Sequence, residues 1–266
     1  MAIIPHKYLD SVVSIGTKDS NGKINWFGTG FFVHRLIDKE KHAAIPFLIS
    51  NKHVLEGVNS VIIRMIKRGT HDLEEVSVPL KGSDGKEIYK CHSTADIAVM
   101  PFPSDIIINN NLEFNSFDID SESMTSVELR DNGVEEGGLL YMLGYPMGLV
   151  NAGSGSPICR LGCVARISEA QISEKKNILV DIQNFPGNSG SPIVNRPEVV
   201  SLNGTKCLEK CVLVGIVHSY IPYQETLLNT QTKQIVEVRS ENSGLANVHP
   251  VEFIREVVDV IQPKVV

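Results

Sequence analysis

The residue of this sequence best suited to nucleophilic chemistry is a serine in a glycine-rich turn. Ser189 lies in the segment Gly187-Asn-Ser-Gly-Ser-Pro192, which follows an apolar strand predicted over residues 178–182. Glycine leaves the hydroxyl uncrowded and lets the backbone bend so that two N–H groups point toward one place. An ordinary polar turn is the alternative, but it does not account for the outer Gly187 and Pro192. The segment therefore predicts a serine that attacks a carbonyl group.

A serine hydroxyl is a weak nucleophile and needs a base that a third group orients. His53 follows the apolar run Leu48-Ile-Ser, so its side chain is expected at the end of a strand. Asp96 stands immediately before the apolar run Ile97-Ala-Val-Met100. Taken singly, each position is also typical of a structural residue at a strand boundary. Together with Ser189 they predict a base, an orienting carboxylate and a nucleophile.

Short segments rich in β-branched residues must position these side chains, and they predict a mainly β fold of antiparallel strands. The segments are residues 12–15, 24–33, 45–50, 61–66, 97–101, 139–143, 178–182 and 212–217. Residues 116–136 differ, because they carry seven carboxylates against one Arg and show no strand alternation. Residues 223–242 are polar and long for a hairpin connection, which is compatible with a ribbon that gates a site or binds a partner.

Four motifs in one order resemble those of the trypsin-like serine peptidases of the chymotrypsin fold. They are Gly28-Thr-Gly-Phe-Phe-Val33, the His53 segment, Asp96-Ile-Ala-Val99 and the Ser189 segment. Gly144-Tyr-Pro-Met-Gly148 and Leu213-Val-Gly-Ile-Val217 are similar to further segments of the family, closest to its bacterial Deg-type and glutamyl-endopeptidase-like members. The resemblance implies two antiparallel β-barrels of chymotrypsin type with a C-terminal α-helix.

The same resemblance implies how the chain divides. A single trypsin-like peptidase domain would span residues 1–266, with a first barrel over about 8–115 and a second over 137–248. The acidic stretch 116–136 would link the barrels. A helix over 249–262 would close the fold, since Pro250 is followed by apolar residues at 254, 257, 258 and 261, the spacing of one helix face. Too little chain follows for a PDZ domain, so any regulation by peptide binding would come from a separate partner chain.

Carried onto this chain, the resemblance implies His53 as general base, Asp96 as its orienting carboxylate and Ser189 as nucleophile. The backbone N–H groups of Gly187 and Ser189 would form the oxyanion hole, and no metal or organic cofactor is expected. Family members activated by proteolysis carry an aspartate just before the nucleophile, where this chain has Asn188. Activation of that kind is therefore not expected.

The substrate pocket is expected between residues 183–188, 217–220 and 243–247, with Gln183, Val217, His218, Ser219 and Tyr220 as substrate-binding residues. Trypsin has an aspartate at the position of Gln183, so cleavage after Arg or Lys is not expected. Glutamate-specific members place a histidine where this chain has Val217, and an offset of one residue reverses a strand side chain. His218 would therefore face the pocket or lie beside Asp96. Tyr220 would narrow the cleft or be a surface aromatic residue.

Composition excludes several classes of protein. With 25 Lys and Arg against 31 Asp and Glu, the net charge of −6 argues against a nucleic-acid partner. No apolar run approaches the roughly 18 residues that cross a bilayer. The start lacks the features of a secretion signal, and an odd number of cysteines, five, suits a reducing compartment, so a cytoplasmic protein is expected. The pairs Cys159-x3-Cys163 and Cys207-x3-Cys211 allow a zinc site, but free thiols are favoured.

These observations predict a serine endopeptidase that hydrolyses peptide bonds in a protein or peptide substrate through an acyl-enzyme intermediate. The alternative is a trypsin-like module that binds peptides and has lost turnover. The presence of His53, Asp96, Ser189 and Gly187 argues against that alternative, because a module freed from catalysis has no chemical need for all four.

Overall fold

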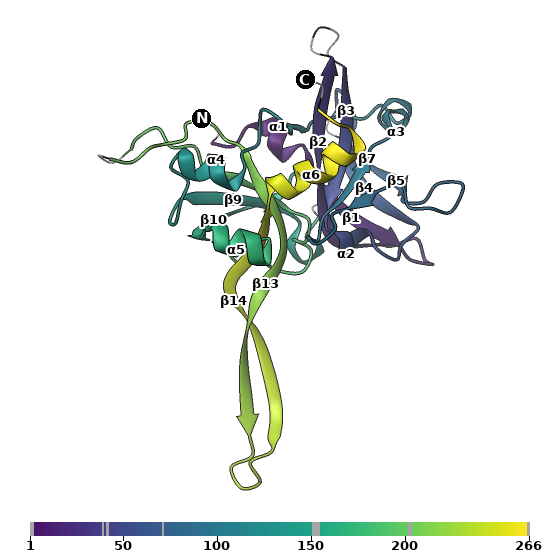
Figure 1. Cartoon of the computed structure of the whole chain (residues 1–266). Coiled ribbons are helices and arrows are strands. Elements are labelled where there is room, and N and C mark those ends of the chain that lie inside the picture. The colour runs from purple at the N-terminus through teal and green to yellow at the C-terminus, as the bar shows by residue number, and fades with distance from the viewer. Residues whose placement is uncertain are drawn as a thin grey trace.

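Antiparallel strands far outweigh helices in the molecule, so the expected mainly β fold is confirmed. The computed structural model describes residues 3–38, 40, 43–70, 72–150, 155–201 and 204–264. Two β units lie side by side, and the helix α6 (Val251–Ile261) lies where they meet (Figure 1). No helix in these described ranges is long and apolar enough to cross a bilayer.

The first unit is an eight-stranded sheet rather than a barrel closed by hydrogen bonds. Its order is β5 (Leu73–Pro79), β4 (Ser60–Ile66), β1 (Val12–Lys18), β2 (Ile24–Asp38), β3 (Ala43–Ser50), β7 (Ala98–Pro101) and β6 (Lys90–Cys91), with the short β8 (Phe117–Asp118) paired to β2. The chain between the end strands β5 and β6 folds back on itself through an isolated bridge between Lys81 and Glu87. Buried residues alternate along β4, and Val61, Ile63 and Met65 pack into the core of this unit.

The second unit is a closed barrel. Its strands run in the order β10 (Ile158–Arg166), β11 (Ile178–Asp181), β14 (Ile235–Pro250), β13 (Leu213–Leu228), β12 (Pro192–Asn195) and β9 (Leu139–Gly144). Its core is filled from facing strands by residues such as Met142, Val180, Ile193 and Val248. Closure leaves the strands of the barrel wall without free edges.

A third apolar cluster joins the two units. Phe31 and Phe47 of the first unit, Leu143 and Leu213 of the second, and Ile254 of α6 belong to one buried cluster. The helix was expected over 249–262 and is found over 251–261, with Pro250 directly before its first residue. The shared core fixes the position of one unit against the other, which a site assembled from both units requires.

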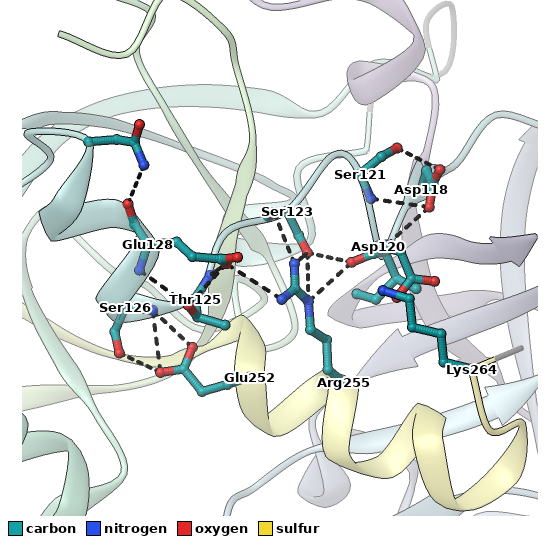
Figure 2. Close-up of polar contacts among 12 residues, drawn as sticks. Asp118, Asp120, Ser121, Ser123, Thr125, Ser126, Glu128, Glu252, Arg255 and Lys264 are labelled. Carbon is teal, nitrogen blue, oxygen red and sulfur yellow. Dashed lines mark hydrogen bonds and ion pairs between the residues drawn. The ribbon is translucent and has the colours of Figure 1, made fainter. Parts of the chain in front are cut away.

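The acidic stretch 116–136 is more ordered than its pattern indicates. It contains β8 (Phe117–Asp118), which pairs parallel to β2, and α4 (Ser126–Asp131), which begins with a capping box between Thr125 and Glu128. Arg255 of α6 donates hydrogen bonds to Ser123, and Glu252 accepts them from Ser126 (Figure 2). The helix therefore holds the acidic stretch against both units.

A buried arginine strengthens the same junction. The Arg35 side chain is 2% exposed and donates from Nε and Nη2 to the two carboxylate oxygens of Asp120, at 3.0 and 3.1 Å. Its Nη1 donates to Asp259 of α6 at 2.5 Å. Burial disfavours the guanidinium charge, but these carboxylates outweigh that cost and raise the pKa of Arg35.

Strands β13 and β14 continue beyond the barrel as a two-stranded ribbon that projects from the molecule (Figure 1). Their pairing extends to Leu228 opposite Ile235, so residues 223–242 form the ribbon that the sequence allowed. The part of β13 nearest the barrel holds the expected substrate-binding residues from Val217 to Tyr220. Ribbon and candidate pocket thus share one continuous strand.

The remaining helices are short. They are α1 (His6–Leu9), α2 (Lys52–Leu55), α3 (Ser104–Asn109), α5 (Glu169–Lys175) and the 3-10 turn η1 (Pro146–Gly148).

Candidate active site

His53 and Asp96 are brought together by two adjacent strands. β3 ends at Ser50 and α2 places His53 just beyond it, while Asp96 stands before β7, which pairs with β3. The Nδ1 atom of His53 lies 2.5 Å from Oδ2 of Asp96, and the His53 backbone N–H donates to Oδ1 at 3.1 Å. A carboxylate only accepts, so Nδ1 carries the hydrogen and Nε2 is left to accept a proton when the ring is neutral.

The charge of Asp96 is stabilised in this position. Burial alone would raise the pKa of the Asp96 carboxyl, but the hydrogen bonds from His53 outweigh burial and hold the pKa below its ordinary value. The group is therefore ionised at neutral pH and can stabilise a positive charge that forms on the imidazole.

The turn that carries Ser189 is fixed from both units. The Thr29 N–H donates to the Ser189 carbonyl at 2.9 Å, and Thr29 Oγ1 donates to the Gly187 carbonyl at 2.7 Å. From the barrel, the Gly190 N–H donates to the Val217 carbonyl at 3.1 Å. Gly190 has a φ of +89°, and a Cβ there would overlap the Thr29 carbonyl oxygen. Only glycine fits this contact between the units.

Two backbone N–H groups of the turn have no acceptor among the described residues. Gly187, with a φ of +96°, and Ser189 donate their backbone N–H groups to no acceptor among the residues that the structure describes. These are the two donors expected for the oxyanion hole.

The segments that carry Ser189 and His53 both contact the backbone of Thr29. The Ser50 hydroxyl, three residues before His53, donates to the Thr29 carbonyl at 2.8 Å, the same carbonyl that Gly190 approaches. Within the described part of the chain, no hydrogen bond joins Ser189 Oγ to His53 Nε2. Such bonds are often long in ligand-free enzymes and tighten when substrate binds.

The expected substrate-binding residues occupy different surroundings. Gln183 is exposed and lies beside Gly244. Val217 is fully buried in the barrel core, so only its backbone meets the serine turn. The Ser219 hydroxyl accepts a hydrogen bond from Asn247 at 3.1 Å, and Tyr220 is 39% exposed. Three members of this set therefore have side chains outside the barrel core: Gln183, Ser219 and Tyr220.

His218 lies behind Asp96, stacked on a second histidine. Its ring is 3.9 Å from that of His249 at an interplanar angle of 7°, and its Nε2 lies 2.9 Å from Asn177 Oδ1. Burial, followed by the neighbouring His249, lowers the pKa of His218 to about 3. Of the two positions considered for His218, the structure has the one beside Asp96. Sequence reasoning did not single out His249 or Asn177.

The cysteines form no disulfide, and all five are free. No group of three or more His, Cys, Asp or Glu side chains that could hold a metal ion occurs in the described ranges. The two cysteine pairs considered for zinc therefore lack further ligands among the described residues.

Comparison with known proteins gives the family. Residues 28–200 match the trypsin-like peptidase domain, while no curated protein sequence matches the chain. The MamO protease domain from Magnetospirillum magneticum (apo form) is similar in structure, with a TM-score of 0.50 and 15% identity over 94% of this chain and 97% of that chain. A structure named GrC matches with a TM-score of 0.45 and 13% identity over 97% of each chain. Since the family match covers more than half of its length, this chain belongs to the trypsin-like peptidase domain family.

Proposed function

We propose that the chain is a serine endopeptidase that hydrolyses peptide bonds of a protein or peptide substrate. The observation that carries the proposal is the hydrogen bond between His53 Nδ1 and Asp96 Oδ2. It fixes the tautomer in which Nε2 of His53 is the basic nitrogen. A general base, a nucleophile and two free N–H donors are the parts that acyl transfer needs.

In the first half of the reaction, Ser189 Oγ bonds to the carbonyl carbon while its proton passes to His53 Nε2. The carbonyl oxygen becomes an oxyanion that accepts from the N–H groups of Gly187 and Ser189, each worth about 2.7–4 kcal/mol in such sites. The imidazolium, stabilised by Asp96, then gives its proton to the amine nitrogen. The C–N bond breaks and an acyl-enzyme ester remains.

In the second half, water attacks the ester carbonyl and gives a proton to His53 Nε2. The same oxyanion donors act again, because the same oxygen becomes negative. The proton then returns to Ser189 Oγ as the ester bond breaks and the carboxylic acid leaves. Every proton and bond of the cycle is accounted for by these side chains, the substrate and one water molecule.

We propose a preference for small or medium apolar side chains before the scissile bond. Gln183 has no charge to pair with a buried Arg or Lys side chain, and an unpaired buried charge costs several kcal/mol. His218 is turned toward His249 and Asn177, which argues against its pairing with a glutamate side chain of the substrate.

A catalytically silent peptide-binding module is the second candidate. The observation that favours it is the absence, among the described residues, of a hydrogen bond between Ser189 and His53. Such a module would bind extended peptides along the cleft and release them uncut.

Labelling with a fluorophosphonate probe, which phosphonylates activated serines, tests the choice. Wild type is expected to be labelled at Ser189, as mapped by peptide mass spectrometry, and Ser189→Ala is expected to be unlabelled. Ser191→Ala is the matched control: its hydroxyl lies two residues away, buried and without a hydrogen-bond partner, so labelling should persist. An unlabelled wild type that still binds peptides would establish the silent module.

A further inference from the structure

Three successive backbone N–H groups of the loop that carries Asp96 donate hydrogen bonds to histidine nitrogens. The N–H groups of Thr94 and Ala95 donate to Nδ1 of His92 at 3.1 and 2.8 Å. The N–H of Asp96 itself donates to Nε2 of His249 at 3.0 Å. His92 lies in the same loop, whereas His249 comes from the end of β14 in the other unit.

The opposite nitrogen of each ring fixes which nitrogen can accept. His249 Nδ1 lies 2.7 Å from the Lys176 carbonyl oxygen, and His92 Nε2 lies 2.8 Å from a carboxylate oxygen of Glu256. Both partners only accept, so those nitrogens carry the hydrogens. His249 Nε2 and His92 Nδ1 must then be unprotonated, because each receives a backbone N–H. Both rings are therefore held neutral, in opposite tautomers.

A single turn supports the histidines behind Asp96. Lys176, in a left-handed conformation after α5, gives its carbonyl to His249, and the next residue, Asn177, gives its side-chain oxygen to His218. The two rings stack face to face at 3.9 Å. The stack is thus held at both rings by adjacent residues of one turn, which limits its freedom to tilt away from Asp96.

We propose that His249 and His92 are positioning residues for the catalytic carboxylate of Asp96, holding its loop by accepting backbone hydrogen bonds. The inference rests on the proposed peptidase function. Asp96 contacts His53 through both carboxylate oxygens, at 2.5 and 3.1 Å, so a shift of the loop would weaken both bonds. Protonation of either accepting nitrogen would set an N–H against an N–H and release the loop.

The surroundings of His249 decide when its Nε2 is protonated. His249 is faced by the His218 ring, the Asp96 carboxylate and His92, with the Lys176 ammonium over the nearby Phe253 ring. Burial dominates and lowers the pKa of His249. His92 has Glu256 as its charged neighbour. The Asp96 N–H therefore keeps its acceptor at neutral pH and loses it when His249 is protonated in acid.

Replacing each histidine by asparagine and by glutamine, whose amide oxygens lie at different distances from the backbone, tests the proposal. A glutamine oxygen reaches the place of Nε2, and an asparagine oxygen reaches the place of Nδ1. His249→Gln and His92→Asn should keep kcat near wild type, whereas His249→Asn and His92→Gln should lower it by about 100-fold with little change in KM. If the histidines only supported the fold, glutamine would not be preferred at position 249 and asparagine at position 92. His34→Gln, at a histidine bonded to Ser116, is the matched control and should leave kcat unchanged.

The downfield proton resonance of the His53 Nδ1–H bonded to Asp96 is the second readout, and it needs no turnover. It should persist in His249→Gln, disappear in His249→Asn, and be lost from wild type on acidification. Equal kcat and equal resonances in the paired variants of an active enzyme would overturn the positioning role alone. An inactive wild type whose resonance still depends on His249 would overturn the proposed function and leave the positioning role standing.

Discussion

Lowering the pH from 8 to 5 should destabilise the fold through His218, and replacing His218 by phenylalanine should remove that effect. The ring is partly buried against His249, and its pKa is about 3 in the folded protein, whereas a histidine in the unfolded chain has a pKa of about 6.5. Below pH 6.5 the unfolded chain binds a proton at this position that the folded protein does not bind. Stability must therefore fall as the pH falls through this range.

The size of the effect follows from the two pKa values. At pH 8 both states are neutral at His218 and the residue contributes no pH dependence. At pH 5 the unfolded ring is almost fully protonated and the folded ring is neutral, which favours unfolding by about 2 kcal/mol. The figure depends almost entirely on the unfolded pKa, since the folded ring is neutral at pH 5. At lower pH the loss levels off at about 5 kcal/mol, once the folded ring is protonated as well.

Urea unfolding of wild type and His218→Phe at the two pH values measures this difference. Phenylalanine keeps an aromatic ring to stack on His249. Because other groups titrate in both proteins, the loss of unfolding free energy from pH 8 to pH 5 in wild type is compared with the same loss in the variant. Wild type should lose about 2 kcal/mol more than the variant between pH 8 and pH 5. Equal losses would refute the reasoning, because His218 would then be protonated or exposed in the folded state.

Two further predictions concern the serine turn and the pocket. Gly190→Ala should lower the free energy of unfolding by about 3 kcal/mol or more, because the new Cβ overlaps the Thr29 carbonyl oxygen. Gly57→Ala, at a similar φ of +81° but with open space around it, should cost only about 1 kcal/mol, and equal losses in thermal or urea unfolding would contradict this contrast. In assays with matched peptides, kcat/KM should be higher for Val than for Arg before the scissile bond, and a clear advantage for Arg would mean that Gln183 does not define the pocket.

Patterns of neighbouring residues in the sequence predicted those parts of the site whose backbone shape depends on nearby residues. Glycine spacing identified the Ser189 turn, and apolar runs identified the strands that end near His53 and begin after Asp96. The helix α6 followed from its apolar spacing. Each of these depends on residues within a few positions of one another, so a single sequence carries the signal.

The support behind Asp96 could not be predicted in this way. His249 and Asp96 are 153 residues apart, and no spacing along the chain relates them. His249 stands just before Pro250, where the pattern indicates only the start of a helix. The first unit was also expected as a barrel, but hydrogen-bonded closure depends on distant strand ends. A local signal did exist for α4, since Thr125 and Glu128 have the spacing of a capping box.

The hydrogen bond from Asp96 to His249 has a consequence during protein synthesis. At elongation rates of about 5–20 residues per second, the 153 residues between these partners take about 8–30 s to translate. Throughout that interval the nascent chain carries Asp96 with His92 but without His249, and α6 follows His249 still later. A ribosome-bound fragment that ends before His249 therefore lacks the acceptor of the Asp96 N–H, and this hydrogen bond can form only after β14 has been made.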